Sequence, residues 1–331
     1  MVNMTNIISV QSLKKQFQVA GGLFEKKEFV NAVLDVSFDI KEGETFSLVG
    51  ESGCGKSTTG RLITRLIDPT EGKIFVNGND IANAKYSELT QLRETVQMIF
   101  QDPYASLNPR MKVKDLIAEP LVIHTKLNKQ EREKLVYEML EIVGLNVEQA
   151  NRYAHEFSGG QRQRIGIARA LITKPKLIIA DEPVSALDVS IQSQILNLLK
   201  RLQQEYNVSY LFISHDLSVV EHISHRVGVM YLGTIVEQGD KEAIFNNPLH
   251  PYTKALLSSV PIADPTLRRE KIILTGDIPN PKNPPPGCTF HTRCPYAMDI
   301  CKSKVPEIQQ VNSQQAVACH LVNEQKAQIT N

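Results

Sequence analysis

The sequence lacks several features that would indicate particular classes of protein. No segment approaches the roughly 18–20 uncharged apolar residues that cross a bilayer, and the strongest apolar runs, at 177–180 and 210–213, have the length of buried strands. The first nine residues do not join a basic region to a long apolar segment, so we expect no secretory signal. If the protein serves a membrane, we therefore expect it to lie on the surface, held there by partners.

An excess of charge of one sign is also lacking. The 37 Lys and Arg residues nearly balance the 36 Asp and Glu residues, which leaves a formal net charge of +1. Such a chain has no general attraction for nucleic acid, and its basic pairs at 26–27 and 268–269 are too short to form a basic patch. We expect no nucleic-acid partner.

Apolar strand-like runs alternate with helical patterns from about residue 7 to 262, which favours a parallel sheet covered by helices. Strands are predicted at 45–49, 96–100, 177–180, 210–214 and 227–231. Between 102 and 157 the apolar spacing is helical, which indicates a helical insertion. Beyond about residue 261 the pattern weakens, and five prolines between 279 and 286 predict a linker or a loop-rich module.

A glycine-rich segment at 50–58, GESGCGKST, has the pattern G-x-x-x-x-G-K-[ST] of a phosphate-binding loop. It follows a predicted strand and precedes a predicted helix, and its glycines allow backbone N–H groups to converge on phosphate oxygens. Lys56 would contact the β and γ phosphates, and Ser57 would ligate Mg²⁺. The predicted nucleotide-binding residues of this loop are Gly50, Ser52, Gly53, Cys54, Gly55, Lys56, Ser57 and Thr58, with no chemistry assigned to the Cys54 thiol.

A second candidate site follows the apolar run at 177–180. The predicted strand ends in Asp181 and Glu182, so that Asp181 would hold Mg²⁺ or its waters and Glu182 would polarise the attacking water. Many strands end in acidic turns, so this pattern is weak by itself. Together with the phosphate loop it becomes a strong indication of nucleotide hydrolysis.

Between these two sites the segment FSGGQRQR at 157–164 resembles the L-S-G-G-Q signature of the ABC ATPase family, with Phe157 in the first position. Ser158 and Gly160 stand where a helix (161–171) is predicted to begin, and they offer a hydroxyl and free N–H groups to an anion. In the family this anion is the γ-phosphate of ATP held by another subunit. The resemblance therefore implies that Ser158, Gly160 and Gln161 bind nucleotide across a dimer interface.

Further motifs similar to those of the family follow its order along the chain. Gln101 resembles the Q-loop glutamine that senses Mg²⁺ and the attacking water, and S-A-L-D at 185–188 resembles the D-loop of the dimer interface. Phe17 stands where an aromatic often stacks on adenine, with a core residue on an edge strand as the alternative. The resemblance thus implies catalytic residues Glu182, His215 and Gln101, Mg²⁺ ligands Ser57, Gln101 and Asp181, and nucleotide contacts from Phe17 and Asp188.

The resemblance covers about 7–320 and narrows to the ATPases of oligopeptide and dipeptide importers, a subfamily that includes nickel importers. It rests on FQDPYASLNPR at 100–110, DEPVSALDVS at 181–190 and NPLHPYT at 247–253. It implies an α/β P-loop NTPase core with a parallel sheet, an antiparallel β subdomain and a helical subdomain at about 102–164. We expect an ATP-binding domain at 1–262 and a Cys- and Pro-rich module at 263–331.

The partners are implied in the same way. They are a paralogous ATPase that forms a heterodimer with this chain, two membrane permeases that dock near 101–111, and an extracytoplasmic peptide-binding protein. The location implied is the cytoplasmic face of the membrane. Import of nickel or another small solute remains open, because this subunit never touches the cargo. A soluble ABC ATPase of translation or DNA repair is less favoured, because those generally carry two cassettes or long coiled-coil or zinc-hook insertions.

Four of the five cysteines gather near the C-terminus, with the spacing C-x5-C-x6-C-x17-C: Cys288, Cys294, Cys301 and Cys319. A disulfide is disfavoured because the ATP site implies a reducing compartment. Zinc usually takes ligands in pairs two to four residues apart, which are lacking here, whereas a 4Fe–4S cluster accepts varied spacings. Some members of the subfamily hold such a cluster, so the resemblance favours 4Fe–4S, with zinc and unligated thiols as alternatives.

Overall fold

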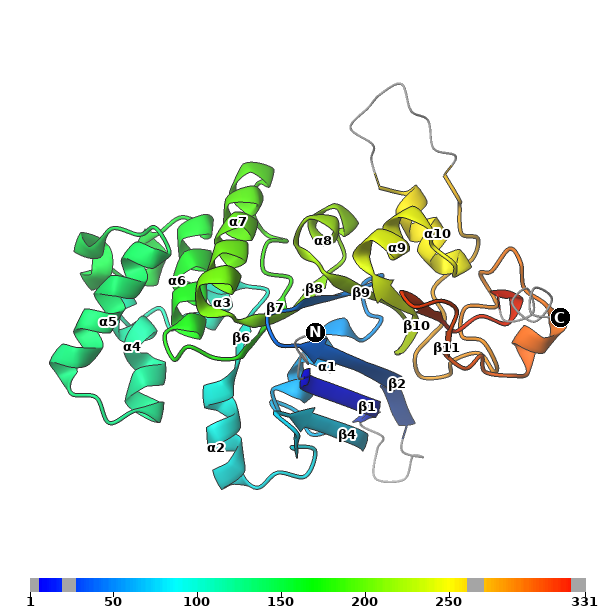
Figure 1. The fold of residues 1–331 in the computed structure, drawn as a ribbon, viewed down its shortest axis with the longest axis horizontal. Coiled ribbons are helices and arrows are strands. Elements are labelled where there is room, and N and C mark those ends of the chain that lie inside the picture. Colours follow the sequence, from blue (N-terminus) through cyan, green and yellow to red (C-terminus); the bar gives the residue numbers. More distant parts are fainter. Residues whose placement is uncertain (1–5, 20–27, 261–270, 323–331) are drawn as a thin grey trace.

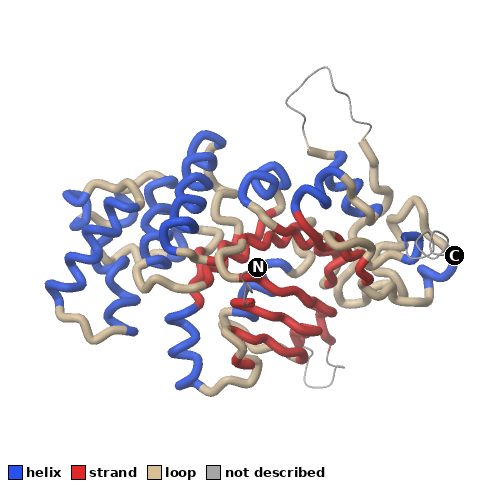
Figure 2. Tube along the Cα trace, viewed as in Figure 1, coloured by secondary structure: helices blue, strands red, loops and turns tan. Residues whose placement is uncertain are grey.

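The computed structural model describes residues 6–19, 28–260 and 271–322. Figure 1 shows an elongated molecule, with a group of helices at one end, strands in the middle and the C-terminal region at the other end. The helices lie mainly on one side of the central strands (Figure 2). None of the helices in the described part of the chain combines the length and the apolar character that crossing a bilayer requires.

The strands form one continuous set in which neighbours are hydrogen-bonded, in the order β5-β4-β1-β2-β10-β9-β3-β8-β7-β6. Their bounds are β1 (Asn6–Val19), β2 (Glu28–Lys41), β3 (Thr45–Val49), β4 (Glu71–Val76), β5 (Asn79–Asp80), β6 (Val96–Ile99), β7 (Leu177–Asp181), β8 (Ser209–Ser214), β9 (Arg226–Tyr231) and β10 (Thr234–Asp240). The central strands β9, β3, β8, β7 and β6 are parallel. The strands β2, β1, β4 and β5 are antiparallel.

All five predicted strands are present, and each begins and ends within one residue of its predicted bounds. The parallel core and the antiparallel β subdomain are therefore confirmed. The periodicity did not predict β10, which turns back antiparallel to β9 and meets β2 at the single pair Thr234–Asp35. That pair joins the antiparallel subdomain to the core.

The helical insertion is also confirmed. Residues 102–171 contain α3 (Pro103–Ser106), α4 (Val113–His124), α5 (Lys129–Ile142), the 3₁₀ turns η1 (Val147–Asn151) and η2 (Ala154–Glu156), and α6 (Gly159–Leu171). Helix α4 packs against both α5 and α6, and the three form the helical end of the molecule (Figure 1). In the described part of this insertion, the β-type backbone pairing consists of one isolated antiparallel bridge, between Lys112 and Tyr153.

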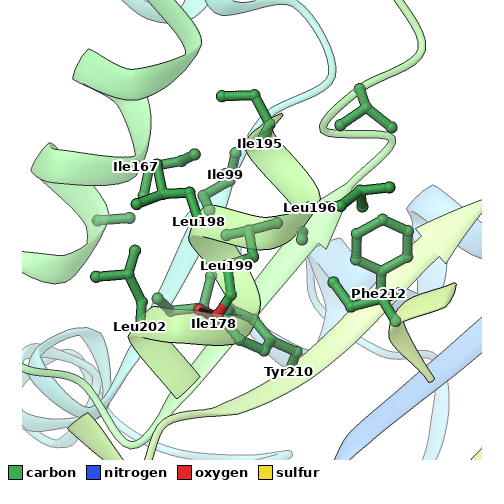
Figure 3. Close-up of a cluster of buried hydrophobic side chains, with 14 of the residues drawn as sticks. Ile99, Ile167, Ile178, Ile195, Leu196, Leu198, Leu199, Leu202, Tyr210 and Phe212 are labelled. Carbon is green, nitrogen blue, oxygen red and sulfur yellow. Dashed lines mark hydrogen bonds between the residues drawn. The ribbon is translucent and has the colours of Figure 1, made fainter. Parts of the chain in front are cut away.

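The remaining helices pack on the sheet or follow it. They are α1 (Lys56–Ile63), α2 (Tyr86–Thr95), α7 (Val189–Tyr206), α8 (Leu217–Ile223), α9 (Lys241–Asn246) and α10 (Pro251–Ser258). Helix α7 buries leucines and isoleucines at helical spacing: Ile195, Leu198, Leu199 and Leu202. Figure 3 shows this face against Ile178 of β7 and Tyr210 and Phe212 of β8. This packing holds β7 and β8, whose carboxyl ends carry the predicted catalytic side chains.

The described C-terminal residues contain little regular structure: η3 (Asp299–Lys302), β11 (Gln309–Gln310) and β12 (Gln315–Val317). Residues 271–298 contain no helix or strand, as the prolines predicted. The unexpected feature is β12, which adds to the sheet antiparallel to β10 through the pairs Glu237–Val317, Gln238–Ala316 and Gly239–Gln315. The C-terminal region is therefore attached to the sheet of the cassette rather than linked to it only by the chain.

Candidate active site

The glycine-rich loop joins the fully buried strand β3 to helix α1. At two positions of this loop the surrounding atoms leave room only for glycine. Gly50 has φ +152° and Gly55 has φ +107°, a region that residues with a Cβ rarely adopt. A Cβ on Gly50 would lie 2.1 Å from the Met230 carbonyl oxygen, and one on Gly55 would lie 2.3 Å from that of Ala32. The curvature of the loop thus depends on both.

Lys56 is buried, with 4% of its surface exposed, at the start of α1. Its Nζ donates hydrogen bonds to the carbonyl oxygens of Gly50 (2.8 Å) and Glu51 (3.0 Å), so the ammonium lies inside the curve of the loop. The buried Cys54 Sγ lies 3.8 Å from the same Nζ. Burial raises the pKa of the Cys54 thiol, which favours its protonated form.

The loop meets the end of β7 at Ser57 and Asp181. The Ser57 Oγ donates a hydrogen bond of 2.7 Å to Asp181 Oδ1. Asp181 is 2% exposed; burial raises the pKa of its carboxyl, and the hydrogen bond from Ser57 opposes that shift. A hydroxyl and a carboxylate in contact are oxygen ligands of the kind that Mg²⁺ prefers, and so these residues fit that cation.

Three predicted catalytic side chains come together at Glu182, the residue after Asp181. The Glu182 carboxylate accepts a hydrogen bond of 2.8 Å from Gln101 Nε2, and its other oxygen lies 3.1 Å from His215 Nδ1. Glu182 itself has φ +46°, an uncommon conformation for a residue other than glycine, and its N–H donates to the Ile213 carbonyl oxygen. Three separate elements, β6, β7 and β8, thus bring Gln101, Glu182 and His215 to one point beside Asp181.

The signature segment lies at the start of α6. The Ser158 Oγ accepts a hydrogen bond from the Gln161 N–H (3.4 Å), and Gln161 Oε1 accepts one from the Ser158 N–H (3.0 Å), which is a capping box. Among the described residues, none of the hydrogen bonds or ion pairs joins 158–161 to the loop at 50–58. The two predicted halves of a nucleotide site are therefore not brought together within one chain.

The remaining predicted contacts are exposed. Asp188 is the exposed residue before α7, and the nearby Ser185 Oγ donates to the Glu182 carbonyl oxygen (3.1 Å). Phe17 lies on β1 opposite Val30 of β2 and is 39% exposed, with the Lys15 Nζ 4.9 Å from its ring centroid. It is therefore not part of the buried core, which the alternative interpretation had expected.

The four C-terminal cysteines line one small pocket, of about 20 Å³, together with Phe290 and His291. All four are free thiols. Burial raises the pKa of Cys288 to about 11 and also raises the pKa of Cys294 and Cys319. In the part of the chain that the structure describes, no three His, Cys, Asp or Glu side chains are grouped as metal ligands. The donor set fits a thiolate-bound metal, but the arrangement of the thiols does not show one.

Sequence reasoning missed one group beside the phosphate loop. The Glu51 N–H donates a hydrogen bond to the Tyr252 hydroxyl (2.9 Å), and the Glu51 carboxylate is paired with Arg293. Glu51 occupies one of the unspecified positions of the loop pattern, and 242 residues separate it from Arg293. No local pattern in the sequence points to this contact.

Comparison with known proteins gives two family matches. Residues 33–185 match the family described as ABC transporter, and residues 236–301 match the one described as oligopeptide/dipeptide transporter, C-terminal region. The chain is 55% identical to the oligopeptide transport ATP-binding protein AppF of Bacillus subtilis (strain 168) over 323 residues, covering 96% of this chain and 98% of that protein. It is 50% identical to the dipeptide transport ATP-binding protein DppF of Escherichia coli (strain K12), covering 96% and 95%.

Solved structures agree on the fold. A dimeric structure of a post-hydrolysis state of the ATP-binding cassette MJ0796, bound to ADP and Pi, has a TM-score of 0.64 and 30% identity. The match covers 71% of this chain and 98% of that one. A structure of cbiO1 from Clostridium perfringens, part of the transporter complex cbiONQ, has a TM-score of 0.63 and 28% identity, covering 73% and 91%.

Proposed function

Because this chain belongs to the ABC transporter family and carries the C-terminal region of oligopeptide and dipeptide transporters, we propose that it is the ATP-hydrolysing subunit that powers peptide import. The observation that carries the proposal is the extent of the similarity. It reaches 55% identity over 96% of the chain with a protein named for oligopeptide transport, and so it includes the C-terminal region as well as the cassette.

The geometry supports ATP hydrolysis by named side chains. The loop N–H groups and Lys56 bind the phosphates, and Ser57 and Asp181 are the residues that would hold Mg²⁺. The cation, when bound, neutralises charge that develops on the phosphates. Glu182 accepts the proton of the attacking water, while Gln101 and His215 orient its carboxylate from either side.

The nucleotide site is completed by a second cassette. The signature residues Ser158, Gly160 and Gln161 lie at a helix N-terminus, whose positive end favours an anion. This end of α6 would contact ATP held by a partner, and Asp188 would lie at the same interface. The related cassette MJ0796 was solved as a dimer, which supports this arrangement. We expect the partner here to be a paralogous ATPase, as in a heterodimer.

The remaining parts of the proposal concern the assembly. Two membrane permeases dock on the helical subdomain near 101–111, an extracytoplasmic binding protein delivers the peptide, and the cassettes lie on the cytoplasmic face of the membrane. Residues 1–262 form the ATP-binding domain and 263–331 the C-terminal domain. The names of the relatives support the permeases and the peptide cargo.

Affinity purification of the tagged chain from its own cells tests the assembly. We expect two integral membrane proteins and a second cassette in the eluate, and uptake of labelled di- and oligopeptides that stops when this gene is deleted. A matched uptake assay with Ni²⁺ separates the two classes of cargo. Loss of Ni²⁺ uptake with normal peptide uptake would contradict the proposal, and so would recovery of the chain with ribosomes.

We also propose that Cys288, Cys294, Cys301 and Cys319 ligate a 4Fe–4S cluster. The support is that all four cysteines line one pocket and that thiolates are the ligands such a cluster takes. A cluster would cross-link a region of the chain that has little regular structure. Anaerobic purification followed by iron, acid-labile sulfide and zinc assays tests this. Four iron atoms per chain are expected; four freely alkylatable thiols without iron, or one zinc per chain, would refute it.

A further inference from the structure

One residue of the phosphate loop, Glu51, is held from three directions. Its carbonyl oxygen accepts the hydrogen bond from Lys56 Nζ (3.0 Å), and its N–H donates to the hydroxyl of Tyr252 on α10 (2.9 Å). Its carboxylate is bound by Arg293 of the C-terminal region. Nη1 donates to Oε2 at 2.7 Å and Nη2 to Oε1 at 3.1 Å, which is the two-pronged geometry that gives strong guanidinium–carboxylate pairs.

This ion pair is well shielded. The Arg293 side chain is 8% exposed and that of Glu51 27%. The Arg293 guanidinium carbon lies 5.9 Å from the Tyr231 ring centroid, and Phe290, three residues earlier, packs edge-on against Tyr231 and also contacts Tyr252. An ion pair that is partly desolvated and held by aromatic side chains stabilises its contact more than an exposed pair, whose two side chains move freely.

Arg293 also belongs to the cysteine segment. It stands next to Cys294, and its N–H donates to the Phe290 carbonyl oxygen at 3.0 Å within the turn that begins at Cys288. Among the described residues, two ion pairs join the C-terminal region to the cassette: this one, and an exposed pair between Lys282 and Glu28 at 2.8 Å. Of these two, Arg293 alone contacts the phosphate loop.

The charge of Glu51 requires a partner for a physical reason. A carboxylate on a phosphate loop repels the triphosphate that the loop binds, and a cation paired with that carboxylate offsets the repulsion. The loop also contains three glycines with positive φ, whose backbone is conformationally free in the unfolded chain, so its shape depends on the contacts that surround it. Arg293 meets both requirements, because it pairs with the charge of Glu51 and holds the Glu51 side chain in place.

We propose that Arg293 is a positioning residue for nucleotide binding, which acts through Glu51 and makes the affinity for ATP depend on the folded state of the C-terminal cysteine segment. Arg293 does not touch the nucleotide. The inference rests on nucleotide binding at the phosphate loop but not on the identity of the cargo.

A double-mutant cycle tests the proposal with the full chain. The ATP dissociation constant is measured by calorimetry without Mg²⁺, so that no hydrolysis occurs, for the parent, Arg293→Gln, Glu51→Gln and the double variant. Arg293→Gln leaves a carboxylate unpaired beside the phosphates, so its affinity should fall about tenfold. The double variant should bind ATP no more weakly than Arg293→Gln. Once residue 51 is a neutral glutamine, loss of Arg293 leaves no unpaired carboxylate beside the phosphates. Arg293→Lys keeps the charge and should recover part of the affinity.

Lys282→Gln is the matched control, because it removes the other ion pair between the two regions and leaves the loop untouched. Its ATP affinity should equal that of the parent. Thermal melts of every variant separate lost affinity from lost folding. Additive effects in the cycle, or equal losses of affinity in Arg293→Gln and Lys282→Gln, would overturn the proposal. No ATP binding by the folded parent chain would instead refute the nucleotide site itself.

Discussion

At the scale of single residues, Glu182 is the side chain that we propose as the base of ATP hydrolysis. Its carboxylate lies between Gln101 and His215, next to the Ser57–Asp181 contact. Because Glu182→Gln removes the proton acceptor and keeps the shape, ATP binding should persist while turnover falls by at least about 100-fold. Steady-state ATPase assays and calorimetric binding check this.

The same change at an exposed glutamate of α8, Glu221→Gln, should leave both quantities unchanged. If Glu182→Gln retained more than a tenth of the parental rate in the assembled complex, the partner's composite site would carry the turnover and Glu182 would not be the base that matters.

His250 gives a second prediction at this scale. Its Nδ1 accepts the Tyr252 N–H at the start of α10, and it is 1% exposed. Burial, with a smaller contribution from the nearby charge of Lys254, lowers the pKa of His250 to about 3. Below about pH 6.5 this histidine is therefore protonated in the unfolded chain but stays neutral in the folded chain. Its effect is to lower the free energy of unfolding by about 2 kcal/mol between pH 7 and pH 5.

His250→Asn keeps an acceptor for the Tyr252 N–H and removes the titration. The loss of unfolding free energy between pH 7 and pH 5, measured with urea, should be about 2 kcal/mol smaller in this variant than in the parent. The buried Glu237, which accepts the His250 N–H, is present in both proteins and cancels in the comparison. An exposed histidine, changed in His155→Asn, should leave the pH dependence as it is; equal slopes in all three proteins would contradict the prediction.

At the scale of elements, the phosphate loop offers a comparison within itself. Gly55 has its Cβ position 2.3 Å from the Ala32 carbonyl oxygen, whereas the Cβ position of Gly53 has no atom within 4 Å, although both have positive φ. Gly53→Ala should cost about 1 kcal/mol for the backbone conformation alone. Gly55→Ala adds a collision with β2, so it should cost at least about 3 kcal/mol and abolish ATP binding.

Urea unfolding and ATP titration of the two variants check this difference. Equal losses of stability in both would show that β2 yields to the added methyl group, and that the close approach of loop and strand is not needed.

The elements also show what the sequence could predict. The strands that lead to Asp181, Glu182 and His215 are short apolar runs, so local spacing was enough to predict the strands, whereas the role of His215 came from the family resemblance. The strand β12 was missed because three residues, Gln315–Val317, are too few for a periodic signal and form a strand only beside β10. The pairing of Glu51 with Arg293 was missed because tertiary contacts between distant residues leave no trace in local patterns.

At the scale of the whole molecule, the proposed site needs two chains, and in the described structure Ser158–Gln161 and the phosphate loop share no hydrogen bond. Ser158→Arg places a bulky cation where the signature helix would meet a partner's ATP. The isolated variant should bind ATP with parental affinity through its own loop, while the ATPase rate of the assembled complex falls at least about tenfold.

Loss of the cap at Ser158 should also cost about 1 kcal/mol, so melting temperatures are measured alongside. Weaker ATP binding by the isolated, folded variant would indicate that the signature segment serves its own chain, and would contradict the two-chain site.

The attachment of β12 to β10 has a consequence for biosynthesis. The pairs between residues 237–239 and 315–317 can form only after residue 317 has left the ribosome, long after β10 itself. Until then one side of β10 presents unpaired backbone groups, and an open strand edge of this kind invites pairing with other chains. Messages that end early would therefore yield cassettes prone to aggregation, even when every motif of the ATP site has been translated.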